Sequence, residues 1–350
     1  MKHRPVLKNE TAFHGFRSYT PLNIIFAFGR ISTLARYIIR RILQAIPLLL
    51  VISIICFGLI QLAPFDVIDT IATPDMAVEV REALKVKYGL DQPGYIQYIN
   101  WLKRMVTGDL GFSIVTHQSV AYDMAARLPN TIILILPGFC LALIISIVLG
   151  LVAGSRRGGR ADKIIDTLCS IGMATPTFWI AMMLIYVFGY MLRIFPILGM
   201  HTLGQDNSLP DLIMHLILPT IVLTIADLPG TTRFVRSSTI SQYTEDFVMV
   251  QKAFGAGRAS ILFKHVMKNV LLPIITLVGM SLPRLVTGAF ITESIFSWPG
   301  IGTYFITAIR SFDYPVIMSV MFFSSVMVIL GNLLADIAYC LVDPRIQSMG

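Results

Sequence analysis

The stretch IILILPGFCLALIISIVLGLVAG, residues 132–154, decides the fold class of this 350-residue chain. It runs for 23 residues without an Asp, Glu, Lys or Arg, and the basic loop Ser155-Arg156-Arg157-Gly158-Gly159-Arg160 follows at once. An uncharged apolar stretch of about 18 residues or more is long enough to cross a bilayer as a helix. We therefore interpret residues 132–154 as a membrane-spanning helix.

Five further apolar blocks of similar length are present. Residues 42–63 and 171–192 also lack charged residues, and the other three blocks contain one each: 212–228 with Asp227, 270–291 with Arg284 and 316–342 with Asp336. The first block has 22 residues, which exceeds the about 7 to 15 apolar residues of a cleaved signal peptide. We expect six transmembrane helices in an all-α polytopic membrane bundle.

The composition weighs against a soluble protein. Hydrophobic residues make up 55% of the chain and charged residues 14%, with a mean hydropathy of +0.73, whereas soluble domains contain about a quarter charged residues. Buried helices of soluble proteins seldom reach about 20 uncharged residues, which argues against a large soluble protein with a helical core.

Lys and Arg are distributed unevenly between the two alternating sets of connecting segments. The set formed by the tail 1–41, 155–163, 230–269 and the C-terminal end carries nineteen, and the opposite set carries eight. Cytoplasmic loops are enriched in Lys and Arg, so both termini are predicted to be cytoplasmic. This asymmetry, with anionic lipid at the cytoplasmic face, accounts for the formal charge of +8, and nucleic-acid binding need not be invoked.

Prolines and glycines interrupt the predicted spans. In a membrane bundle a proline either kinks a helix or breaks it beside a cavity, because neighbouring helices satisfy the freed backbone groups. The prolines are Pro47, Pro137, Pro176, Pro219, Pro273 and Pro283. Gly150 and Gly154 have the spacing of small residues that permits close helix packing.

Two segments outside the spans are long enough to fold. Residues 64–130 contain amphipathic stretches at 76–88 and 97–105, which predict a small helical segment on the outer face. Residues 233–269 contain two helical patterns around Gly255-Ala256-Gly257, and such a helical pair under the membrane indicates a protein partner. The remaining divisions are a cytoplasmic extension at 1–36, a first transmembrane helix at 37–63 and a transmembrane core at 131–346.

Cysteine and histidine patterns do not predict a metal site. The four cysteines lie in or beside apolar blocks without a CxxC pair, and no two histidines are four residues apart. His117, His201 and His215 fall on or near the predicted outer face and leave a metal-binding role there as an alternative.

Short motifs along the chain resemble a known family. The segment 233–269 and the residues after it contain Asp246-Phe247-Val248, Ala253-Phe254-Gly255, Lys264-His265, Asn269 and Leu271-Leu272-Pro273. The other fragments are Arg36 to Pro47, Leu62-Ala63-Pro64, Tyr88 to Pro93, Gly108 to Gly111, Arg127 to Thr131, Pro176 to Trp179, Arg233 to Ser238, Glu293 to Gly302, Asp313-Tyr314-Pro315, Asn332 to Asp336 and Asp343 to Ile346. In order and spacing, from about residue 35 to 346, they resemble the permeases of binding-protein-dependent ABC importers, in particular the oligopeptide, dipeptide and nickel branch.

The resemblance implies a type I ABC importer permease in a bacterial cytoplasmic membrane, which forms a translocation path for peptides by alternating access. It implies as partners a second homologous permease, two cytoplasmic ATPase subunits and an extracytoplasmic solute-binding protein. The chain would be no enzyme and bind no cofactor, with ATP and Mg held by the ATPase subunits; its sequence contains no Gly-x-x-x-x-Gly-Lys-Ser/Thr phosphate loop. A nickel or metal-chelate substrate is the alternative within the family.

The resemblance also assigns site residues and shows three departures. ATPase coupling falls on Asp246, Phe247, Ala253, Gly255, His265, Asn269 and Pro273. Val250-Gln251-Lys252 stands where the wider superfamily has Glu-Ala-Ala, and the tail 1–34 has no counterpart. Arg284 and Asp227 stand where small or apolar residues are expected, which bears on the substrate and not on the fold.

The candidates for the translocation path are Arg284, Asp227, Glu293 and Trp298. A guanidinium within a span costs at least about 2.5 to 3.5 kcal/mol, so Arg284 is expected to face a partner or a watery path. It either pairs with Asp227 or Asp336, or reaches the outer interface, or attracts a substrate carboxylate.

The rival classes explain less of the sequence. In a transporter driven by an ion gradient, Asp227, Arg284 and Asp336 would serve as a charge relay, but the helical segment 233–269 argues against that class. A purely structural membrane scaffold has no feature in its favour.

Overall fold

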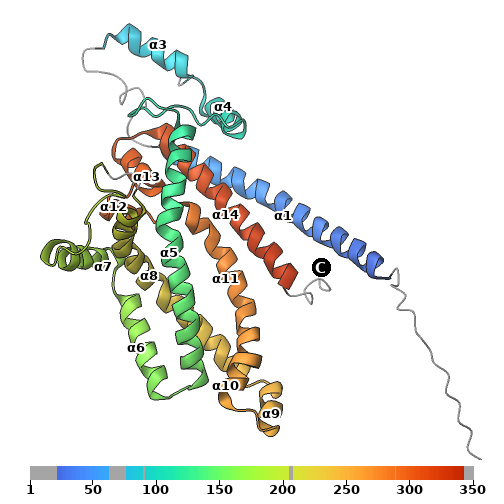
Figure 1. The fold of residues 1–350 in the computed structure, drawn as a ribbon. Coiled ribbons are helices and arrows are strands. Elements are labelled where there is room, and N and C mark those ends of the chain that lie inside the picture. The colour runs from blue at the N-terminus through green and yellow to red at the C-terminus, as the bar shows by residue number, and fades with distance from the viewer. Residues whose placement is uncertain (1–21, 63–75, 90, 205–207, 288, 343–350) are drawn as a thin grey trace, which may run out of the picture.

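The computed structural model describes residues 22–62, 76–89, 91–204, 208–287 and 289–342, and it is an elongated bundle of helices (Figure 1). Within these ranges the β-structure is limited to one isolated bridge between Phe112 and Ser119. The helices are α1 (Leu22–Gln61), α3 (Val78–Tyr88), α4 (Gly94–Val106), α5 (Val120–Ser155), α6 (Arg160–Ala174), α7 (Thr177–Leu184), the π-helix η1 (Ile185–Met191), α8 (Leu209–Tyr243), α9 (Asp246–Ala253), α10 (Arg258–Ser260), the π-helix η2 (Ile261–Val266), α11 (Met267–Thr287), α12 (Phe290–Ile295), α13 (Ile301–Arg310) and α14 (Tyr314–Val342).

Five helical stretches in the described residues are long and apolar enough to cross a membrane, and a bent pair brings the number to six. The five are Ile39–Leu59, Val120–Ser155, Leu209–Tyr243, Arg258–Gly279 and Tyr314–Ala335. The prediction of about six transmembrane helices in an all-α bundle is therefore confirmed.

The third predicted span, 171–192, differs from a straight helix. α6 ends at Ala174, and the chain bends by 94° before it continues through α7 and η1. The cause is Pro176, because the residue before a proline is pushed out of the α region. Thr175 accordingly has φ −90° and ψ 122°.

The two longest described spans, α5 and α8, pack closely at the centre of the bundle. A Cβ added at Gly150 would lie 2.5 Å from the Cβ of Val235, and one added at Gly154 would lie 2.5 Å from the Cβ of Thr239. Glycine therefore lets the α8 backbone approach α5, as its small-residue spacing predicts.

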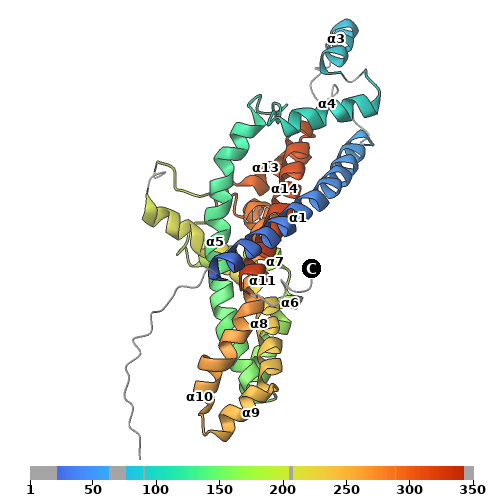
Figure 2. The same ribbon diagram turned by 90° about the vertical axis from the view of Figure 1, so that its right-hand side faces the viewer.

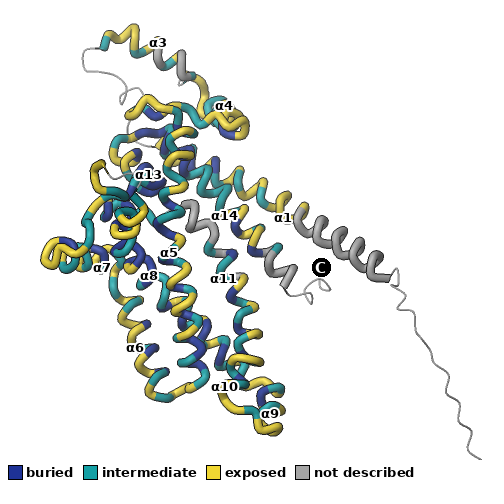
Figure 3. Tube along the Cα trace, viewed as in Figure 1, coloured by how far each residue is buried: buried dark blue, intermediate teal, exposed yellow. Residues whose placement is uncertain are grey.

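The two segments outside the bundle lie at opposite ends of the molecule. α3 and α4, which match the predicted helical stretches 76–88 and 97–105, lie at one end, and α9 and α10 lie at the other (Figures 1 and 2). α1 packs against α14 and α4 along one side only, and much of its described surface is exposed (Figure 3). Such an apolar surface suits lipid or another membrane subunit.

Candidate functional sites: a coupling tip and an outer clamp

The first candidate site is the coupling tip, which we define as residues 246–263. α9 ends in a glycine turn in which the N–H of Gly255 donates to the Lys252 carbonyl and the N–H of Ala256 donates to the Gln251 carbonyl, both at 3.0 Å. Gly255 has φ +78°, in the left-handed region that glycine enters without steric cost. The turn reverses the chain and sends it back into η2 and α11.

The inner side of the coupling tip is anchored to the bundle. Val248 and Ile261 of the tip, and Val266 just after it, are almost completely buried, and they pack with Leu151 of α5 and Val235 of α8. Because protein interiors are close-packed and deform little, a displacement of α9 is passed to these helices.

The outer side of the coupling tip is apolar and exposed. The side chains of Phe254 and Met249 are 85% and 72% exposed, and Val250 and Phe263 of the same segment are also exposed. Met249, Val250 and Phe254 come before the apolar stretch Arg258–Gly279 and after α8, and an exposed apolar patch outside a predicted span marks an interaction surface.

The residues predicted to couple to an ATPase lie in two places. Asp246, Ala253 and Gly255 are exposed at the tip, and Phe247 is half-buried there. His265 is half-buried in η2, while Asn269 and Pro273 lie behind the tip on α11. Sequence reasoning included Phe254 in the motif Ala253-Phe254-Gly255 but did not single out Met249 or Phe254 as coupling residues, although large apolar residues outside a predicted span are a usable signal.

Ion pairs between α6 and α8 support the same end of the bundle. Arg236 Nη2 donates to Asp162 Oδ2 at 2.9 Å, and Arg233 Nε donates to Asp166 Oδ1 at 3.2 Å. The N–H of Gly158 also donates to Asp162, whose side chain is nearly buried. The bidentate arginine contact fixes α6 against the end of α8 that leads to the tip.

The second candidate site is the outer clamp, which we define as Asn130, Thr131, Glu293 and residues 298–303. The indole N–H of Trp298 donates to the Asn130 carbonyl at 2.8 Å, and the Asn130 amide donates to the Pro299 carbonyl at 3.0 Å. The Thr131 hydroxyl donates to Glu293 Oε1 at 2.9 Å and accepts from the N–H of Ile301 at 2.8 Å. The clamp thereby joins two motifs that lie more than 160 residues apart in the chain.

Glu293 is the electrostatic centre of the outer clamp. Its side chain is fully buried, and the N–H of Thr303 donates to Oε2 at 3.1 Å. Burial raises the pKa of this carboxyl, while the hydrogen bonds from Thr131 and from backbone N–H groups act in the opposite direction. A Cβ at Gly300 would lie 2.5 Å from Glu293 Cδ and from Thr131 Oγ1, so a larger residue at position 300 would displace the carboxylate.

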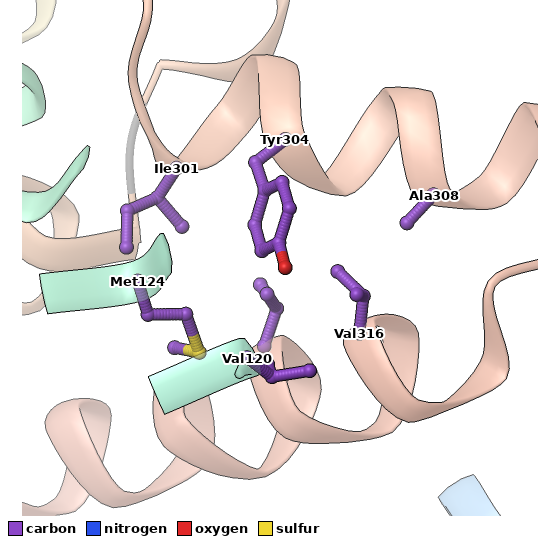
Figure 4. Close-up of a cluster of buried hydrophobic side chains, with 7 residues drawn as sticks. Val120, Met124, Ile301, Tyr304, Ala308 and Val316 are labelled. Carbon is purple, nitrogen blue, oxygen red and sulfur yellow. The ribbon is translucent and has the colours of Figure 1, made fainter. Parts of the chain in front are cut away.

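α13 is held in place next to the outer clamp by an apolar cluster. Val120 and Met124 of α5 pack with Ile301, Tyr304 and Ala308 of α13 and with Val316 of α14 (Figure 4).

Hydrogen bonds to Asp313 connect the loop after α4 to the same end of the bundle. The Asp313 carboxylate accepts hydrogen bonds from the Ser113 hydroxyl at 2.5 Å and from the N–H of Ile114 at 3.2 Å. The loop after α4 is therefore tied to the start of α14.

The residues proposed for the translocation path are not brought together. Glu293 and Trp298 are fully buried in the outer clamp, and Asp227 is half-buried on α8. Arg284 lies on α11 and Asp336 on α14, but their side chains fall outside the described residues.

Two of the three histidines predicted for the outer face, His201 and His215, lie beside Asp211 at the start of α8. His201 Nδ1 lies 3.3 Å from Asp211 Oδ2, and His215 Nε2 lies 3.6 Å from Asp211 Oδ1. The described part of the chain contains no group of three or more His, Cys, Asp or Glu side chains placed to hold a metal ion.

Comparison with known proteins identifies the family. Residues 146–348 match the model of the binding-protein-dependent transport system inner membrane component, and residues 34–135 match the model of the N-terminal part of such membrane components.

Curated relatives match over nearly their whole length. The chain is 42% identical to the oligopeptide transport system permease protein AppB of Bacillus subtilis, over 90% of this chain and 100% of that protein. It is 32% identical to the dipeptide transport system permease protein DppB of Alkalihalophilus pseudofirmus, over 89% of this chain and 99% of that protein. It is 31% identical to the glutathione transport system permease protein GsiC of Escherichia coli K12, over 89% of this chain and 98% of that protein. The chain thus belongs to the family of binding-protein-dependent transport system inner membrane components.

Proposed function

We propose that this chain is a permease subunit of an ATP-driven importer of peptides. The observation that carries the proposal is the coupling tip, whose inner side is anchored to α5 and α8 while Phe254 and Met249 are exposed to a partner. The named activities of the relatives, which transport oligopeptides, dipeptides and glutathione, support a peptide as substrate. The partners would be a second homologous permease, two ATPase subunits that bind ATP and Mg, and an extracytoplasmic solute-binding protein.

The mechanism follows from the length of the helices. α8 has 35 residues and is about 52 Å long at 1.5 Å per residue, which exceeds the about 30 Å of the hydrocarbon core. It therefore reaches from the outer loop to the coupling tip as one element. Closure of the ATPase dimer would push the tip, and α8 would carry that motion across the membrane as a rigid body.

The proposed orientation places the coupling tip and both termini in the cytoplasm. It rests on the excess of Lys and Arg on that side and on the position of α3 and α4 at the opposite end of the bundle. Reporter fusions after Arg160 and after Arg258 should then give cytoplasmic signals, and a fusion near Thr116 an external one. A cytoplasmic signal at Thr116 would overturn this orientation.

The docking role of the coupling tip is tested with Phe254→Glu. Because the side chain is already exposed, the charge should leave folding intact but weaken co-purification of the ATPase subunits and reduce peptide uptake. Phe112→Glu is the matched control, since Phe112 is 68% exposed at the opposite end. If Phe254→Glu keeps wild-type uptake and ATPase co-purification, the tip does not couple transport to ATP.

For the translocation path we propose Arg284 as the group that attracts a substrate carboxylate, with Asp227 near the path. Arg284→Met should impair peptide uptake without loss of complex assembly, and Arg284→Lys should fall between, since it keeps the charge but loses the planar fork. Rescue of Arg284→Met by Asp227→Asn would instead indicate a structural ion pair. Parallel uptake assays with a labelled peptide and with labelled nickel distinguish the two substrate classes.

Glu293 and Trp298 contribute to the proposed path in a different way. Both are fully buried inside the subunit, so they act by fixing the chain between α12 and α13.

A further inference from the structure

A groove of about 290 Å³ lies between α1 and α14. Its walls are mainly aliphatic, with Ala45, Leu48 and Leu49 on α1 and Val326, Ile329 and Leu330 on α14. Three polar residues, Arg41, Gln44 and Asn332, also line it.

The polar residues gather at one end of the groove. α1 and α14 run in opposite directions (Figures 1 and 2), so Arg41 and Gln44 near the start of the α1 span face Asn332 late in α14. Leu49 and Val326 line the other end. The groove is therefore amphipathic along its length.

The dimensions of the groove match one leaflet of a bilayer. Arg41 and Leu49 are eight residues apart, which is about 12 Å along the helix, and one leaflet contributes roughly half of a hydrocarbon core of about 30 Å. In the proposed orientation the polar end lies at the cytoplasmic face, where Arg40 and Arg41 reach the headgroup level. The apolar end then lies near the middle of the bilayer.

We propose that this groove binds one anionic phospholipid of the cytoplasmic leaflet. An acyl chain would lie along Leu48 and Leu330, and the headgroup phosphate would accept hydrogen bonds from the Arg41 guanidinium and from the Gln44 and Asn332 amides. Basic pockets between transmembrane helices at the cytoplasmic side have the chemistry to hold anionic headgroups.

A lipid explains the groove better than a helix of the second permease does. A helix laid over the groove would bring its apolar face against Arg41, Gln44 and Asn332, whereas a phospholipid supplies both an apolar chain and an anion at the matching end. The proposal uses the orientation given under the proposed function but does not depend on transport.

The test is native mass spectrometry of the purified complex in titrations with phosphatidylglycerol and, separately, phosphatidylcholine. Leu48→Trp should fill the groove and weaken phosphatidylglycerol binding at least tenfold. Leu43→Trp should not, because Leu43 is also exposed on α1, 60% against 51% for Leu48, but lies outside the groove. Arg41→Gln should reduce the preference for phosphatidylglycerol about fivefold, and Arg40→Gln, outside the groove, should have a smaller effect.

Several outcomes would overturn the proposal. Equal effects of the two tryptophan variants, or of the two glutamine variants, would show that lipid binds α1 without using the groove. Loss of the second permease from the complex in Leu48→Trp, with unchanged phosphatidylglycerol binding, would assign the groove to that subunit. The proposed function fails separately, through the uptake and ATPase assays, because the lipid titration requires neither.

Discussion

Replacement of Thr131 by valine tests whether the outer clamp depends on its buried hydroxyl. Valine has nearly the same shape but cannot donate to Glu293 Oε1 or accept from the N–H of Ile301, bonds of 2.9 and 2.8 Å. Each buried group left without a partner costs about 1–3 kcal/mol, so the loss of both hydrogen bonds should lower the free energy of unfolding by roughly 2–6 kcal/mol. For a chain of this size, about 2 °C per kcal/mol places the fall in Tm at roughly 4–12 °C.

Thermal unfolding of the purified protein in detergent measures this change. Thr131→Ser is the control, because it keeps both hydrogen bonds and loses one methyl group, at a cost of about 1 kcal/mol. The hydrogen bond from Thr131 favours the charged form of Glu293, so the deficit of Thr131→Val should grow as the pH rises. Equal losses in Tm for the serine and valine variants would refute the role assigned to the hydroxyl.

Three further variants probe, in turn, the outer clamp, the contact between α5 and α8, and the coupling tip. Glu293→Gln should flatten the dependence of stability on pH. Because the pKa of Glu293 is raised in the folded state, the stability that its carboxyl contributes is fully present below the ordinary carboxyl pKa and is lost as the pH rises through the raised pKa. Measuring Tm from pH 5 to 8 for the variant and the wild type checks this. Gly150→Ala should lower the free energy of unfolding by about 1–3 kcal/mol, because the added methyl group would collide with Val235. Gly58 has open space around its Cα, so the control Gly58→Ala should be neutral or stabilising by up to about 1 kcal/mol in the same thermal assay. Gly255→Asp should abolish uptake and weaken binding of the ATPase while membrane insertion stays intact, because Gly255 has a left-handed backbone. The control Gly257→Asp, at φ −68°, should reduce uptake and ATPase binding less. Equal losses of uptake in the two variants would point to the added charge rather than to the backbone at Gly255.

The sequence predicts the helical bundle well because its signal is local. Uncharged stretches such as 132–154 and the breaker at Gly255 act through their own residues, and the structure has a helix and a left-handed turn at these positions. The break at Pro176 is harder to predict, because a proline can either kink or break a membrane helix, and the sequence does not give the angle of 94° between α6 and the α7–η1 segment.

The outer clamp could not be derived from local patterns. Arg127 to Thr131 and Glu293 to Gly302 are visible as motifs, but that Thr131 would meet Glu293 depends on how α5 lies against α12 and α13. From the sequence, Glu293 is predicted to line the translocation path, because its partners in the fold are not visible there. In the fold its carboxylate is enclosed by Thr131, Gly300 and Thr303. A charge in an apolar region indicates that a partner is needed, not which partner is present.

The packing of α5 against α8 constrains how motion can cross this subunit. Val235 and Thr239 sit over Gly150 and Gly154, so a slide of α8 along α5 would drive their β-carbons into larger neighbours on α5. The two helices should therefore move as one body. Val248 connects them to the coupling tip at one end, and Thr131 connects them to the outer clamp at the other. If this is correct, Thr131→Val should leave ATPase binding unchanged but reduce the peptide transported per ATP hydrolysed, because the outer end no longer follows the tip. Unchanged transport per ATP, measured in reconstituted vesicles alongside the expected loss of Tm, would show that the outer clamp stabilises the fold without taking part in coupling.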